Sequence, residues 1–117
     1  MPYKRILEAV LARVAGARSA LLLDAQGEVV VGAGQLDERE RLIGAYQGIS
    51  LGMVSRAAQR VGIGEVRTLV SRHTGGAVVL ATLKDGYYLV LSMGPQSLVG
   101  GAVRQCEEAR HQLNLEL

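Results

Sequence analysis

The fold is decided by the stretch Gly75-Gly-Ala-Val-Val-Leu-Ala-Thr-Leu-Lys-Asp-Gly-Tyr-Tyr-Leu-Val-Leu91, in which two apolar runs flank a short polar link. The link contains Asp85-Gly86, a pair favoured in tight hairpin turns because both positions tolerate a positive φ. Gly75-Gly76 marks a second turn just before the first run. The stretch therefore predicts antiparallel strands over residues 77–83 and 87–91.

The segment before this stretch, residues 65–73, is polar and rich in β-branched residues, which predicts one more strand. Val66, Thr68 and Val70 alternate onto one face of it. This amphipathic character is typical of a strand at the edge of a sheet, so the three strands are expected to form a meander.

Upstream, two shorter apolar runs at residues 19–23 and 28–31 are joined by the turn-forming link Asp24-Ala-Gln-Gly27. They predict a second antiparallel pair. Apolar residues at helical spacing predict a helix over residues 3–15. Gly94-Pro95 is expected to stop the last strand and begin a final helix, because proline is tolerated at the first helical position.

A long helix is predicted over residues 37–61, with Asp37 as its cap and Glu40 reaching back as in a capping box. It is the only connection long enough to act as a crossover. The chain of 117 residues is therefore expected to be a single α/β (α+β) domain, residues 1–117, with the order α-β-β-α-β-β-β-α and a mostly antiparallel five-stranded sheet with helices packed on its faces.

Three glycines recur every fourth residue inside this helix, at Gly44, Gly48 and Gly52. Each costs roughly 1 kcal/mol relative to alanine. They lie along one ridge, and an apolar stripe is centred on the opposite side, so the stripe is expected to face the core and the ridge to face a second copy of the chain. The stripe consists of Leu42, Ile43, Tyr46, Ile49, Met53, Val54, Ala57 and Val61.

The composition is that of an ordinary folded domain, with 49% hydrophobic and 21% charged residues. A net charge of +2 with scattered Lys and Arg argues against a nucleic-acid partner. The single cysteine fits a reducing compartment. The sequence starts without the apolar stretch of a signal peptide and holds no run of 18 apolar residues, so a cytoplasmic location without membrane insertion is expected.

No catalytic group, cofactor or metal is expected. The glycines of residues 32–34 and 94–101 lack the spacing and the lysine of nucleotide-binding loops. His73 and His111 have no metal-ligand spacing and are expected to be exposed. Cys106 lies on the apolar side of the last helix, where a buried, unreactive thiol is expected.

Three segments resemble roadblock (dynein light chain) domains of the bacterial or archaeal type. Residues 11–30, which include Gly16, Asp24 and Gly27, are similar to their first helix, turn and hairpin. Residues 62–69, Gly-Ile-Gly-Glu-Val-Arg-Thr-Leu, resemble their entry to the third strand, and residues 97–108 resemble their final helix. The resemblance spans essentially the whole chain, and the order and spacing of the motifs carry it.

The resemblance implies an antiparallel sheet with the long helix on one face and the first and last helices on the other. Family members commonly form homodimers by pairing their third strands into a ten-stranded sheet, with the two long helices side by side. The family has no catalytic residues of its own, and bacterial and archaeal members typically partner Ras-like small GTPases. The helix glycines are a departure from the family pattern.

The leading hypothesis is therefore a non-enzymatic homodimeric adaptor or regulator that binds a Ras-like small GTPase. The alternative is a small-ligand sensor domain, whose distinguishing sign would be a large pocket or a retained small molecule. The predicted dimer interface consists of Gly44, Gly48, Leu51, Gly52, Ser55, Val66, Thr68 and Val70.

Overall fold

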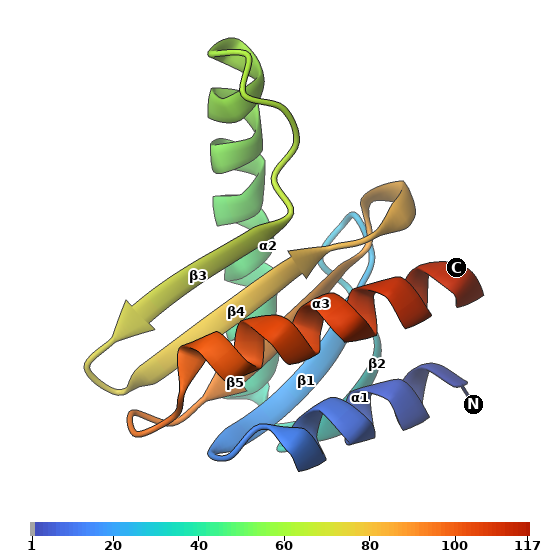
Figure 1. Cartoon of the computed structure of the whole chain (residues 1–117), viewed down its shortest axis with the longest axis vertical. Helices are drawn as coiled ribbons and strands as arrows, with labels where there is room; N and C mark the ends of the chain where they lie inside the picture. The colour runs from blue at the N-terminus through green and yellow to red at the C-terminus, as the bar shows by residue number, and fades with distance from the viewer. Residues whose placement is uncertain (1) are drawn as a thin grey trace.

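A computed structural model describes residues 2–117 and confirms the order α-β-β-α-β-β-β-α (Figure 1). The helices are α1 (Pro2–Arg13), α2 (Glu38–Arg60) and α3 (Val99–Glu116). The strands are β1 (Ala17–Leu23), β2 (Val29–Gly34), β3 (Thr68–His73), β4 (Gly76–Thr82) and β5 (Tyr88–Met93).

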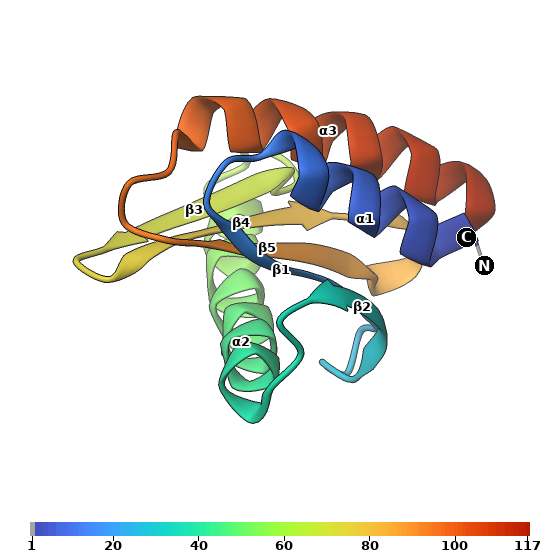
Figure 2. The ribbon, with the colours of Figure 1, turned by 90° about the horizontal axis from the view of Figure 1, so that it is seen from below.

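The five strands form one sheet in the order β2-β1-β5-β4-β3, and every neighbouring pair is antiparallel. Helix α2 lies on one face, while α1 and α3 lie side by side on the other (Figure 2). The expected three-layer arrangement is thus confirmed. Strands β2 and β3 are the two edges of the sheet, and the β1–β2 pairing carries an irregularity between Leu22 and Leu23.

Both faces of the sheet are covered, which explains why its three central strands are apolar at most positions. In β1, Leu21 and Leu23 belong to the core beneath α2, whereas Ala20 and Leu22 belong to the core beneath α1 and α3. The larger core is completed by Leu7, Val10 and Val14 near α1 and by Ala102, Cys106, Ala109 and Leu113 of α3. The core on the α2 side draws mainly on the sheet, with Val78, Leu80, Tyr88 and Val90.

The turn chemistry follows the sequence closely. Asp85 has φ of 59° and Gly86 has φ of 81°, so both occupy the left-handed region that the Asp-Gly pair favours. At the first hairpin, Asp24 Oδ1 accepts hydrogen bonds from the backbone N–H groups of Gln26 and Glu28, at 2.9 and 3.0 Å. The left-handed backbone at Asp85-Gly86 and the hydrogen bonds of Asp24 thus shape the two hairpins locally.

Two predicted boundaries were wrong. Helix α3 begins at Val99 rather than at Pro95, because the Gly94 N–H donates to the Gly16 carbonyl at 2.9 Å and ties the chain to the α1–β1 corner first. Strand β3 begins at Thr68, so Val66 lies outside it. The Val66 carbonyl instead accepts a hydrogen bond from Thr82 Oγ1 at 2.8 Å.

The start of α2 is fixed by Asp37, whose side chain accepts a hydrogen bond from the Glu40 N–H at 3.0 Å, as predicted. The second half of the expected capping box is wrong. The Glu40 side chain does not turn back to the cap, because it accepts a 2.7 Å hydrogen bond from Ser19 Oγ of β1. Both side chains are only 1% exposed, so this bond joins α2 to the sheet inside the protein.

Ser19→Ala is expected to lower the free energy of unfolding by about 1–3 kcal/mol, because the buried Glu40 carboxyl group loses its partner. Urea unfolding followed by circular dichroism measures the change. The double variant Ser19→Ala/Glu40→Leu should recover most of the loss, since no polar group is then buried without a partner. A single-variant loss under about 0.5 kcal/mol would show that the bond contributes little.

Candidate protein interaction surface

The glycines of α2 face the protein's own sheet, so the predicted outward orientation of the glycine ridge is wrong. Gly44 is buried, and a Cβ built on it would lie 3.1 Å from Leu21 Cδ1 and 3.2 Å from Leu23 Cδ2. A Cβ on Gly48 would lie 2.9 Å from Tyr88 Cζ. Only Gly52 differs, because its nearest neighbour is the end of the Arg56 side chain.

Large side chains of the sheet explain this orientation. The Tyr88 side chain is 2% exposed, and its hydroxyl donates to the Gly44 carbonyl at 3.3 Å. Burial, and secondarily the negative charge of Asp24, raise the pKa of Tyr88. Leucines and a tyrosine thus fill the space beneath α2. Because Gly44 and Gly48 carry no side chains, the helix backbone can lie close to them.

The opposite side of α2 carries an exposed apolar stripe. The stripe, defined here as the outward stripe, consists of Leu42, Tyr46, Ile49 and Met53, which are 47%, 63%, 61% and 61% exposed. Their spacing of four, three and four residues keeps them on one line of the helix. Because the protein's own core does not use these side chains, the stripe is a candidate for contact with a partner.

A second candidate is the free edge of β3 together with the adjoining side of α2. Strand β3 pairs with β4 and, among the described residues, has no partner strand on its other side. Gln47 Nε2 donates to Ser71 Oγ of β3 at 3.5 Å, so this side of α2 faces β3. Val54, two turns further along the same side, is 39% exposed. We call this side of α2 the β3 flank.

Positive charge surrounds the outward stripe. Arg39, Arg41, Arg56 and Arg60 are all exposed on α2. The helix has two acidic residues, Glu38 and the buried Glu40, and both lie in its first turn. A partner surface that carries carboxylates around an apolar centre would complement this arrangement.

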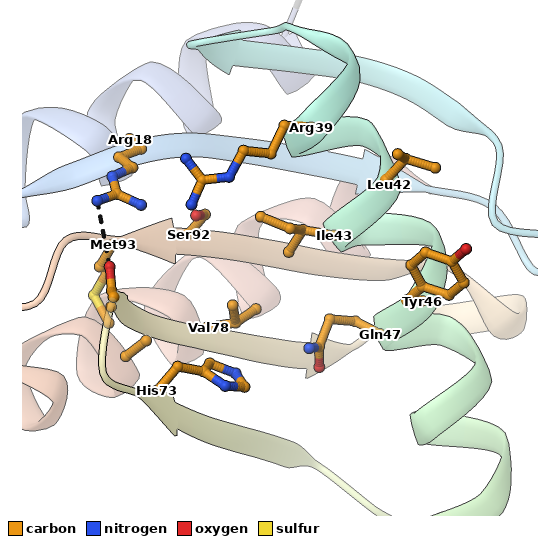
Figure 3. Close-up of a pocket in the computed structure, with 13 residues that line it drawn as sticks. Arg18, Arg39, Leu42, Ile43, Tyr46, Gln47, His73, Val78, Ser92 and Met93 are labelled. Atoms are coloured by element: carbon orange, nitrogen blue, oxygen red, sulfur yellow. Dashed lines mark hydrogen bonds between the residues drawn. The ribbon is translucent and has the colours of Figure 1, made fainter.

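Between α2 and the β3–β4 hairpin lies a partly open cavity of about 490 Å³ (Figure 3). Its polar side chains include Arg18, Arg39, Gln47, His73 and Ser92. Its apolar lining includes Leu42, Ile43, Tyr46, Val78 and Met93. The Arg18 guanidinium donates to the Gly75 carbonyl at 3.3 Å, which holds it at the hairpin end of the cavity.

The reactive side chains are placed as the sequence suggested. His73 and His111 are exposed. Cys106 is fully buried, and burial, with a smaller effect of Glu107, raises the pKa of its thiol to about 12. Within residues 2–117 no group of three or more His, Cys, Asp or Glu residues could hold a metal ion, and no helix is long and apolar enough to cross a membrane.

The predicted interface residues therefore fall into separate places. Gly44, Gly48 and Leu51 pack on the protein's own sheet, and Val66 precedes the edge strand. Thr68 and Val70 do lie on the free edge strand. Gly52 is half-buried on α2. Ser55 lines a hollow of about 480 Å³ near the β4–β5 turn.

Two features were missed by reasoning from the sequence. The apolar pattern of the outward stripe is visible in the sequence, but the sequence prediction places it in the core. The glycines on the opposite side of α2 are the signal for the correct orientation, because a helix can lie close to large side chains of a sheet where it carries no side chains itself. The cavity had no sequence signal, because Arg18, Arg39 and His73 come from three different elements and meet only in the folded chain.

Comparison with known proteins identifies the architecture. A Roadblock/LC7 domain from Streptomyces avermitilis has a TM-score of 0.87 and 18% identity, with 97% of this chain and 95% of that chain covered. The gliding protein MglB of Thermus thermophilus has a TM-score of 0.84 and 19% identity, with coverages of 95% and 84%. MglB of Myxococcus xanthus has a TM-score of 0.86 and 14% identity, with coverages of 97% and 93%. At such identities the likeness shows the fold.

No curated protein sequence matches the chain. The sequence model of the Roadblock/LC7 domain, however, matches residues 5–92, which include most of α1, all of α2 and nearly all of the five strands. With the fold and the sequence model in agreement, the chain belongs to the Roadblock/LC7 domain family.

Proposed function

We propose that this chain is a cytoplasmic, non-enzymatic adaptor that forms a homodimer and binds a Ras-like small GTPase. The observation that carries the proposal is the outward stripe of α2, four exposed apolar side chains that the chain's own core leaves uncovered. Membership of the Roadblock/LC7 family supports it, because the resemblance to bacterial and archaeal members of that family implies such a partner.

In this proposal the dimer forms through the β3 edge and the β3 flank of α2. An exposed edge strand has backbone groups ready to pair with another strand. Thr68 and Val70 lie on that strand, and Val54 lies on the flank beside it. These residues replace Gly44, Gly48 and Leu51 in the proposed interface, because those three pack inside the protomer.

The GTPase would dock on the outward stripe. Because the stripe points away from the sheet, pairing through the β3 flank leaves it uncovered in both copies. Two stripes with their arginines then lie on the same side of the dimer and offer a broad apolar surface with a positive rim. Such a regulator acts by binding one nucleotide state of the GTPase more tightly than the other.

A small-ligand sensor is the second candidate, and the 490 Å³ cavity is the observation that favours it. Its size falls in the range of ligand pockets. The cavity is partly open rather than enclosed, so the adaptor remains the leading proposal.

The proposal predicts that light scattering at micromolar concentration gives twice the 12.4 kDa mass of the chain. It also predicts binding to a Ras-like GTPase of the same organism, with different affinities for the GDP-bound and GTP-analogue-bound forms. Titration calorimetry with each form measures both affinities. A monomeric mass in solution would contradict the proposed dimer. Equal affinity for both nucleotide forms, or binding to neither form, would contradict the proposed regulatory role.

A further inference from the structure

We propose that the cavity between α2 and the β3–β4 hairpin binds a small organic anion, with its carboxylate or phosphate between Arg18 and Arg39 and its apolar body against Ile43 and Val78. This inference goes beyond the adaptor function and does not depend on it. It rests on the volume, the charge and the lining of the cavity.

The charge of the cavity is one-sided. Arg18 and Arg39 line it together with His73, and none of the 13 lining residues is Asp or Glu. In Figure 3 the Arg39 side chain reaches from α2 over β5 toward Ser92, while Arg18 approaches from β1 on the same side. Because both guanidinium groups line the cavity and no lining residue is a carboxylate, a bound anion would be attracted to both.

The hydrogen-bonding capacity of the two arginines fits an oxyanion. A guanidinium carries five N–H donors in a planar fork that matches a carboxylate or a phosphate. Arg18 uses one donor on the Gly75 carbonyl, a bond that fixes its position at the cavity wall. The remaining donors of both arginines, with the Ser92 hydroxyl beside them, can accommodate the oxygen atoms of one anionic group.

Apart from Gln47 and His73, the rest of the lining is mainly apolar, so an inorganic ion alone would leave most of the cavity unused. Ile43 and Val78 lie opposite each other on the helix and the sheet, and Leu42 and Tyr46 extend the apolar wall toward the outside (Figure 3). A volume of about 490 Å³ accommodates a molecule with a ring or a short aliphatic chain. The ligand class is therefore an anionic head group on a compact apolar body.

The test is a nuclear magnetic resonance titration of the ¹⁵N-labelled full chain with phenyl phosphate and, separately, with benzoate. We expect amide shifts concentrated at residues 75–78 and near Ile43, with a dissociation constant of about 1 mM for probes of this size. Comparison of the two probes distinguishes a phosphate site from a carboxylate site. Phenol and inorganic phosphate, which each lack one half of the proposed ligand, should bind at least about tenfold more weakly.

Arg18→Gln and Arg39→Gln should each weaken binding of the preferred probe by about tenfold or more, since a bidentate charged contact is lost. Arg104→Gln is the matched control, because Arg104 is exposed on α3 at the other face of the sheet and should leave binding unchanged. The spectrum of each variant verifies its fold.

The proposal is overturned if neither probe shifts the cavity residues, if phenol binds as well as phenyl phosphate, or if the arginine variants bind like the wild type. The GTPase adaptor is tested separately through Ile49 of the outward stripe, because Ile49 does not line the cavity, whereas Arg39, Leu42 and Tyr46 lie beside both surfaces. Conversely, if the chain binds the anion probes and binds no Ras-like GTPase of the same organism, the small-ligand sensor becomes the favoured function.

Discussion

Replacement of Gly48 by leucine is expected to lower the free energy of unfolding by about 3 kcal/mol or more, because the added side chain has no space beneath α2. A Cβ alone would lie 2.9 Å from Tyr88 Cζ and closer still to the Tyr88 hydroxyl. The helix would have to lift off the sheet, and the Tyr88–Gly44 hydrogen bond would break. Thermal and urea unfolding followed by circular dichroism measure the loss.

Alanine substitutions along the same helix provide the matched series. Gly48→Ala should destabilise the domain, and the additional change Tyr88→Phe should recover part of the loss by removing the hydroxyl. Gly52→Ala should instead stabilise it by about 0.5–1 kcal/mol, since alanine is the better helix residue and only the flexible end of Arg56 lies nearby. If the glycines instead faced outward, Gly48→Leu, Gly48→Ala and Gly52→Ala would all fold normally, and only self-association would be lost.

The second large effect is expected from two charged substitutions on α2 that separate its two proposed contacts. Val54→Asp, on the β3 flank, should convert the dimer to a monomer, with self-association weakened about 100-fold, because an unpaired carboxylate would be buried between the copies. Ile49→Asp, on the outward stripe, should keep the dimer mass and lose GTPase binding by a similar factor. Light scattering reports the first effect, and calorimetry with the GTPase reports the second.

Both side chains are exposed in the single chain, so neither variant should change thermal stability much. Gln112→Asp, which adds the same charge on the exposed side of α3, is the control for both assays. If Ile49→Asp also gave a monomer, the outward stripe would be the dimer contact itself, and the proposed division of the helix into two surfaces would be incorrect.

The hairpins could be predicted from the sequence because their signals are local. Asp85-Gly86 and Asp24 act through backbone conformation and hydrogen bonds within a few residues, and no distant contact overrides them. The start of α3 shows the limit of this reasoning. Pro95 is compatible with a helix start, but the bond between Gly94 and Gly16, far apart in sequence, decides where the helix begins.

The orientation of α2 could not be read from the helix alone. A helical periodicity gives the angle between a glycine ridge and an apolar stripe, but not which of the two meets the sheet. That choice depends on the size of the opposing side chains, here Tyr88 and Leu21, which come from strands far away in sequence. The family resemblance supplied the layers, and it gave no information on the glycines or the cavity.

The irregular pairing at the β2 edge has a consequence for how many copies can join. Strand β2 includes Gly32 and Gly34, and its ladder with β1 shifts between Leu22 and Leu23, so this margin is a poor template for strand addition. Strand β3 has a regular ladder with β4. An antiparallel union through β3 is isologous, and it uses up the one regular margin of each subunit. In the proposed dimer, assembly through the sheet would therefore stop at two chains and would not propagate into a ribbon.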